Sequence, residues 1–215
     1  MLIAIAQIAA VLATTAFAPV PEPADAVPVA SAAMVVNVTA AADISRSLVT
    51  AALHEADAVW RLAGFRFIWE RNPAMTTTSG LRVVIGGGAS KTSDRQLPLA
   101  WIGFDKEGAP TSFIYVSHAN AVQFMENSRE SVGSTDSMPL LQKETYLARA
   151  MGRALAHEIG HYLLASRQHA GKGLMTATHS APEFFMADRS AFAINALERR
   201  QMAARFTSIY LASRG

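Results

Sequence analysis

The 215-residue chain contains no cysteine. This absence excludes disulfide bonds, thiolate metal ligands, a cysteine nucleophile and lipid attachment at cysteine. A chain of this length with 51% hydrophobic residues can bury a substantial core without such links. We therefore expect one ordinary globular domain.

Charge is also scarce, because only 17% of the residues are charged and the formal net charge is +2. The chain has no basic run, and its aromatic residues do not alternate with Lys or Arg, so nucleic acid is not an expected partner. Gly86-Gly87-Gly88 lacks the lysine and the spacing of a phosphate-binding loop, and we interpret it as a tight turn.

The first 20 residues contain no charged side chain, and prolines stand at positions 19, 21 and 23, at the end of this segment and just after it. This segment resembles a secretory signal peptide, although it lacks the usual basic residue before the apolar region. Ala24-Asp25-Ala26 offers a small-residue cleavage site, which predicts removal of residues 1–26 and a domain over residues 27–215 that starts at Val27. The mature protein would then be secreted or periplasmic, without stable membrane association. The alternative is an N-terminal membrane anchor.

Hydrophobic periodicity predicts an α+β domain with no internal repeat. We expect strands at 34–38, 65–70, 81–85, 100–104 and 112–116, a helix over 43–62, a loop over 126–139, a helix that enters the segment 157–161, and a final helix from 181 to about 206.

The segment His157-Glu158-Ile159-Gly160-His161 is the most informative feature of the chain. Residues four apart on a helix lie about 40° apart around its axis, so both imidazoles project from one face and can bind one metal ion. The residues from 141 to 156 contain no proline and place apolar side chains at helical spacing, which puts the segment within a helix. This pattern predicts a metal site, with zinc as the expected ion.

Glu158 stands beside the two histidines. A zinc site with three protein ligands keeps a fourth position for water, and an adjacent carboxylate can take the proton of that water. The pattern HExxH is therefore typical of zinc-dependent peptide hydrolysis, and Glu158 is the predicted general base.

The order of elements and the segment from His157 to Met175 resemble the catalytic domain of metzincin-type zinc metallopeptidases. That family has HExxHxxGxxH followed by a methionine turn beneath the metal. Here Leu164 and Arg167 stand where the family has its glycine and third histidine, and the next histidine is His169. The resemblance implies a divergent, small exported zincin-like protein with a mixed twisted sheet, zinc bound by His157, His161 and His169, and a turn at Gly173-Leu174-Met175.

Other residues of the chain are also candidate metal ligands. Glu183 is the main alternative to His169, because a glutamate from a helix downstream of HExxH completes the site in gluzincin-type peptidases. His179 follows the expected turn and is a weaker candidate. His54 and His118 are interpreted as ordinary surface or core histidines.

The expected function is that of an exported zinc metallopeptidase, in which a zinc-bound water attacks the peptide bond and Glu158 accepts its proton. The resemblance implies that a peptide or protein substrate pairs with an edge strand, for which residues 97–104 are the candidate, although Trp101 and Phe104 can equally be core residues. The alternative function is a zinc-stabilised binding protein that keeps a metzincin-like shell without turnover.

Overall fold

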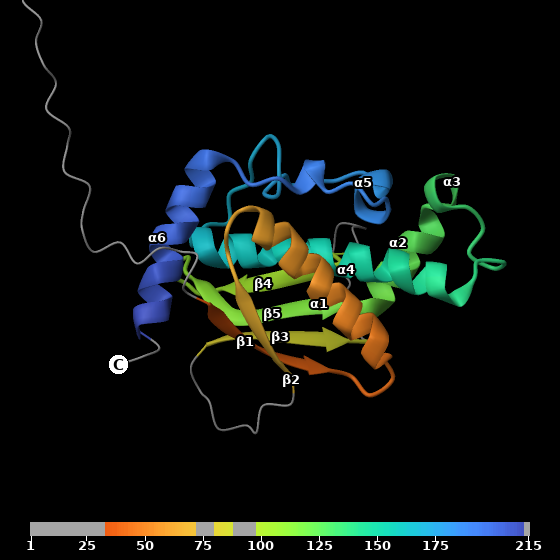
Figure 1. Ribbon diagram of the computed structural model, residues 1–215, viewed down its shortest axis with the longest axis horizontal. Coiled ribbons are helices and arrows are strands. Elements are labelled where there is room, and N and C mark those ends of the chain that lie inside the picture. The colour runs from red at the N-terminus through yellow and green to blue at the C-terminus, as the bar shows by residue number, and fades with distance from the viewer. Residues whose placement is uncertain (1–32, 72–79, 88–97, 213–215) are drawn as a thin grey trace, which may run out of the picture.

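The structure is a computed structural model that describes residues 33–71, 80–87 and 98–212. Its elements follow the order shown in Figure 1. They are β1 (Met34–Ala40), α1 (Arg46–Leu62), β2 (Phe67–Arg71), β3 (Leu81–Gly86), β4 (Ala100–Phe104), β5 (Pro110–Ser117), α2 (His118–Asn127), α3 (Arg129–Val132), α4 (Leu140–Leu164), α5 (Ala181–Phe185), the 3-10 helix η2 (Ser190–Phe192) and α6 (Ala196–Ala212).

The five strands form one mixed sheet in the order β2-β1-β3-β5-β4. The pairings β1 with β2, β1 with β3 and β3 with β5 are parallel, whereas β4 joins β5 in the antiparallel direction, with Ile102 opposite Ile114. Because β4 is the last strand in this order, its outer edge has no strand partner among the described residues. The predicted α+β class with a mixed sheet is confirmed.

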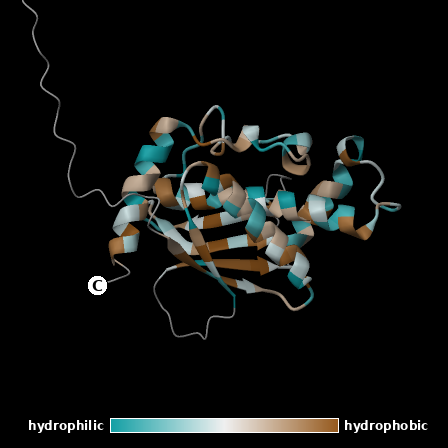
Figure 2. Cartoon of the chain, viewed as in Figure 1, coloured by the Kyte–Doolittle hydropathy of each residue, from teal (hydrophilic) through white to brown (hydrophobic). Residues whose placement is uncertain are grey.

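Helices α1 and α4 pack against one another on one face of the sheet (Figure 1). Their backbones approach closely at Gly152 of α4, where an added Cβ atom would lie 2.5 Å from the carbonyl oxygen of Ala52 and 2.7 Å from the Cβ of Glu55. Figure 2 shows that hydrophobic residues dominate the strands. The core beneath the helices includes Trp60, Phe65 and Met151, each of which is fully buried.

The structure corrects three boundaries expected from the sequence. Helix α1 begins after Ser45, whose hydroxyl accepts a hydrogen bond from the amide of Leu48, and not at residue 43. The segment 118–127, for which no helix was predicted, forms α2 because Ser117 caps it through the amide of Asn120. The predicted loop over 126–139 contains the short helix α3.

The expected final helix over 181–206 is also wrong as one continuous element. It begins at Ala181 as predicted, but α5 ends at Phe185 and a new helix starts at Ala196. The side chain of Asn195 accepts hydrogen bonds from the amides of Leu197 and Glu198, and this cap fixes the start of α6. The break creates the segment 186–195, from which Arg189 donates hydrogen bonds to Glu55 of α1.

The five predicted strands lie within two residues of those observed. The expected signal peptide and the junction at Val27 lie outside the described residues, as does part of the glycine turn at 86–88, so these remain predictions. Within the ranges that the structure describes, no helix is long and apolar enough to cross a membrane.

Candidate metal centre

His157 and His161 project from the same face of α4, near its C-terminal end. The Nδ1 atom of His157 lies 2.7 Å from the carbonyl oxygen of Leu174, and the Nδ1 atom of His161 lies 2.7 Å from the carbonyl oxygen of Ser166. A carbonyl only accepts hydrogen bonds, so each Nδ1 is the protonated donor and each Nε2 carries a lone pair. Both rings are thereby held in the tautomer and orientation that a metal ion requires.

The two Nε2 atoms lie 3.0 Å apart. Two lone pairs at this separation repel unless a proton or a cation lies between them. Two nitrogens bound tetrahedrally to zinc at about 2.05 Å are themselves about 3.3 Å apart, so the arrangement is close to that of two zinc ligands. The donor atoms present therefore fit a zinc ion.

His169 completes a group of three histidines. Its ring centroid lies 5.3 Å from that of His157 and 4.9 Å from that of His161. One ligand atom from each of the three residues lies within 4.8 Å of the others. His157 is half-buried, His161 is buried and His169 is exposed, so the group opens to solvent on the side of His169.

The chain reverses after α4 so that His169 can return to the helix. Helix α4 ends at Leu164, and Ala165 adopts a left-handed conformation with φ 50° and ψ 40°. The amide of Ser166 then donates to the carbonyl of His161 over 3.3 Å, as in a Schellman turn. The left-handed residue therefore lies one position after the site of the family glycine, which is Leu164 here.

We expect Ala165→Gly to raise the free energy of unfolding by about 0.5–1 kcal/mol. An alanine in the left-handed conformation costs roughly 1–2 kcal/mol, and glycine avoids this cost. The greater conformational freedom of glycine in the unfolded chain offsets part of the stabilisation. Chemical denaturation measures the change. The control Ala204→Gly, on the exposed side of α6, should instead lose up to about 1 kcal/mol, because that residue is helical. A loss of stability in Ala165→Gly would contradict the strained turn.

The segment Gly173-Leu174-Met175 forms the turn that the sequence predicted. Gly173 has φ 83°, and the amide of Thr176 donates to its carbonyl over 3.1 Å. Met175 is buried beneath α4, where its sulfur would lie 2.2 Å from a Cβ atom added at Gly160. Glycine at position 160 therefore leaves room for the Met175 side chain, and the same turn places the Leu174 carbonyl against His157.

Burial lowers the pKa of His157 to about 4 and also lowers the pKa of His161. Both imidazoles are consequently neutral at pH 7, which is the form that binds metal. The lowered pKa values and the hydrogen bonds at Nδ1 therefore both favour neutral imidazoles whose Nε2 atoms carry a lone pair.

Glu158 lies between the metal-ligand candidates and the edge of the sheet. Its burial raises the pKa of its carboxyl to about 8, and a hydrogen bond with the backbone of Ile102 acts in the opposite direction. A divalent cation held by the neighbouring imidazoles would lower this pKa and favour the carboxylate. The contact with Ile102 joins the predicted general base to strand β4.

Strand β4, the last strand of the sheet, borders the site. The ring of Phe104 meets that of His161 edge-on at 6.3 Å, and the guanidinium of Arg167 lies 4.7 Å from the centre of the Phe104 ring. Phe104 and Trp101 are only partly buried. The candidate edge strand is thus observed over Ala100–Phe104, whereas Leu97 lies outside the described residues.

A pocket of about 550 Å³ opens beside His157, Glu158 and His169. Leu99 and Ala100 contribute from the β4 side, and Phe184 and Phe192 contribute from α5 and η2. Arg153 and His179 also line this pocket. The sequence alone did not predict that either residue would contribute to the pocket. Arg153 precedes His157 by four residues, and this spacing is the signal that places the two on one helix face.

The other ligand candidates are not members of the histidine group, although His179 lines the same pocket as His157. The carboxylate of Glu183 accepts hydrogen bonds from the amide and hydroxyl of Ser180 at 2.6 and 2.8 Å, which completes a capping box at the start of α5. His179 stacks on Phe192, His54 is exposed on α1, and His118 begins α2. Among the described residues, the group of His157, His161 and His169 is the one that could hold a metal ion.

No protein-family model and no curated protein matches the sequence. Among solved structures, the fold is similar to the crystal structure of an archaemetzincin from Methanopyrus kandleri, with a TM-score of 0.51 and 11% sequence identity. The match covers 82% of this chain and 97% of that chain. At this identity the likeness shows the fold alone, and the chain is therefore a single domain of archaemetzincin-like fold that carries a histidine triad.

Proposed function

We propose that this protein is a zinc-dependent metallopeptidase. The observation that carries the proposal is the convergence of three imidazoles, two of them fixed by carbonyl groups at Nδ1. Two of the three, His157 and His169, line one pocket together with Glu158. The archaemetzincin-like fold supports the same class of function. We also propose that the protein is exported and that residues 1–26 are removed.

His157, His161 and His169 would hold the zinc ion. When bound, zinc would act as a Lewis acid that polarises the substrate carbonyl and makes water more acidic. The Leu174 and Ser166 carbonyls support this role because they fix the two helical imidazoles, and such outer contacts typically contribute 10 to 100-fold to metal affinity.

Glu158 would accept the proton from the attacking water at its carboxylate and deliver it to the leaving amine. The burial of Glu158 limits its contact with water, and the hydrogen bond with the backbone of Ile102 holds its carboxyl group beside β4. The open edge of β4 would pair with the backbone of an extended peptide. Backbone pairing orients a peptide without requiring a particular side chain at each position.

Metal removal tests this proposal. We expect a chelator to abolish hydrolysis of a broad peptide library and added zinc to restore it, while magnesium fails because it prefers oxygen ligands. The experiment measures cleavage by mass spectrometry, with circular dichroism as a check that the chelated protein stays folded. Chelator-resistant cleavage would contradict the proposal. Stoichiometric zinc without any cleavage would favour the alternative of a zinc-stabilised binding protein.

A further inference from the structure

The pocket beside the histidine triad has a cationic group at its inner wall. Arg153 lies one helical turn before His157, lines the same pocket, and has no solvent-exposed side-chain surface. Its guanidinium can donate five hydrogen bonds and remains charged in proteins. What these donors contact therefore decides whether Arg153 is only a structural residue.

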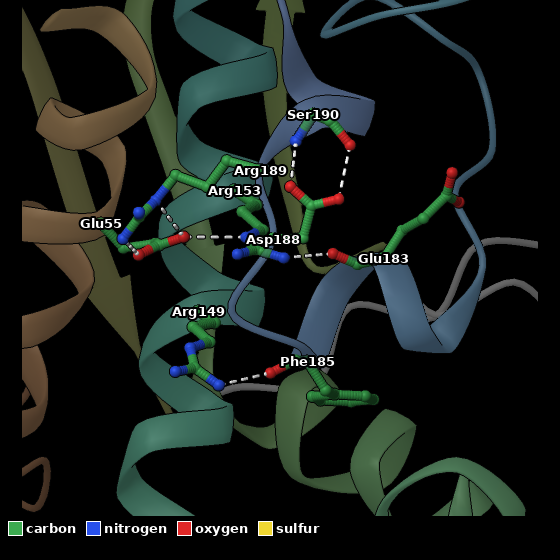
Figure 3. Close-up of polar contacts among 8 residues, drawn as sticks. All are labelled: Glu55, Arg149, Arg153, Glu183, Phe185, Asp188, Arg189 and Ser190. Atoms are coloured by element: carbon green, nitrogen blue, oxygen red, sulfur yellow. Dashed lines mark hydrogen bonds and ion pairs between the residues drawn. The ribbon is translucent and has the colours of Figure 1, made fainter. Parts of the chain in front are cut away.

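Two of the three guanidinium nitrogens of Arg153 have partners (Figure 3). Nε donates to the carboxylate of Glu55 over 2.8 Å, and Nη1 donates to the backbone carbonyl of Glu183. Nη2 is buried and has no hydrogen-bond partner among the described residues. An unpaired charged donor in an enclosed site is costly, so this nitrogen calls for an acceptor.

His179 lines the same pocket. Its side chain is only 6% exposed, and its Nε2 atom is buried without a close hydrogen-bond partner among the described residues, while the backbone of Leu174 and the carboxylate of Glu183 interact with its ring. Both residues contact the ring of Phe192. The His179 ring stacks on it at 4.2 Å, and the guanidinium carbon of Arg153 lies 5.1 Å from its centre.

The charges around Arg153 leave an excess of positive charge. Glu55 accepts hydrogen bonds from both Arg153 and Arg189, so one carboxylate faces two guanidinium groups (Figure 3). Asp188 is a second carboxylate that acts on Arg153, and Arg149 is a third guanidinium near it, so positive charges still outnumber negative ones. The Asp188 carboxylate is also bonded to Ser190, and the Glu183 carboxylate to Ser180. An incoming anion would balance this excess.

We propose that this pocket is a substrate subsite for a carboxylate group, with Nη2 of Arg153 as its principal donor. The inference rests on the proposed peptidase function, because it assigns the pocket to the same substrate. The carboxylate is either that of an acidic side chain or that of the peptide C-terminus. The aromatic walls formed by Phe124, Phe184 and Phe192 would contact the apolar part of the residue and exclude water, which strengthens the charged contact.

Peptide binding to the zinc-loaded Glu158→Ala variant tests the subsite without requiring turnover. The probes are capped alanine pentapeptides in which one glutamate or one glutamine occupies each position in turn, together with an alanine pentapeptide that has a free C-terminal carboxylate. Calorimetry should show binding about 10 to 100-fold tighter for a carboxylate probe, because a hydrogen bond to a charged group contributes on that scale. Preference for glutamate identifies a side-chain subsite, and preference for the free terminus identifies a terminal one.

Arg149→Met is the matched control for Arg153→Met. Arg149 also extends from α4 to α5, where it donates to the carbonyl of Phe185 over 2.8 Å, but it does not line the pocket. We expect only Arg153→Met to lose the carboxylate preference. Equal loss in both variants would overturn direct recognition, and equal binding of every probe to the Glu158→Ala protein would overturn the subsite even if Arg153→Met fails to fold. Carboxylate preference in a protein that cleaves nothing would support the subsite and count against the proposed function alone.

Discussion

Glu158→Ala is expected to retain zinc while losing at least about 100-fold in kcat/KM for peptide hydrolysis. A positioned general base contributes about 10² to 10⁴-fold to the rate of reaction. Zinc should be retained because the three candidate ligands are histidines and Glu158 is not one of them. Zinc content by metal analysis and cleavage of a fluorogenic peptide, measured on the same preparation, separate the two effects.

Glu158→Gln is the matched control, because it keeps the size of the side chain but cannot accept the proton as a carboxylate does. We expect it to lose as much activity as Glu158→Ala. Wild-type activity in either variant would exclude Glu158 as the base. Loss of zinc from both would instead assign Glu158 a role in holding the metal.

His169→Ala is expected to weaken zinc binding by more than about 100-fold, whereas Glu183→Ala should bind zinc almost as the wild type does. Loss of a ligand exceeds the 10 to 100-fold effect typical of groups that only support a ligand. The structure places His169 next to the two helical histidines and places the Glu183 carboxylate on Ser180. Competitive titration with a chromophoric chelator measures both affinities.

Glu183→Ala also removes part of the cap of α5, so thermal unfolding must accompany the titration. The expected cost of that cap is on the order of 1 kcal/mol and should leave zinc affinity unchanged. Near-normal zinc affinity in His169→Ala, together with severe loss in Glu183→Ala, would overturn the metzincin-like assignment in favour of a glutamate ligand.

The parts of the site that the sequence predicted are those with a fixed local spacing. His157 and His161 share a face because any α-helix places residues four apart in that way, and the apolar spacing before them indicated the helix. The turn at Gly173 and the return of His169 depended on the resemblance to metzincins. The structure brings the three histidines together and forms the turn at Gly173 beside them.

The parts that the sequence did not predict depend on contacts between distant segments. Arg153 meets Glu55 from another helix, and their positions differ by 98 residues, so no local pattern pairs them. The final helix was expected to run from Ala181 to about Phe206 without a break. The end of α5 at Phe185 and the cap of α6 at Asn195 instead divide it, and the segment between them places Phe192 at the pocket wall.

X-ray absorption at the zinc edge tests the central claim most directly. The claim is that three imidazoles of this chain bind one zinc ion. Zinc-loaded wild-type protein is predicted to contain one zinc per chain, with nitrogen ligands at about 2.0 Å and the multiple scattering of three histidine rings, falling to two rings in His169→Ala. Fewer than three rings in the wild type, or an unchanged spectrum in His169→Ala, would contradict the account.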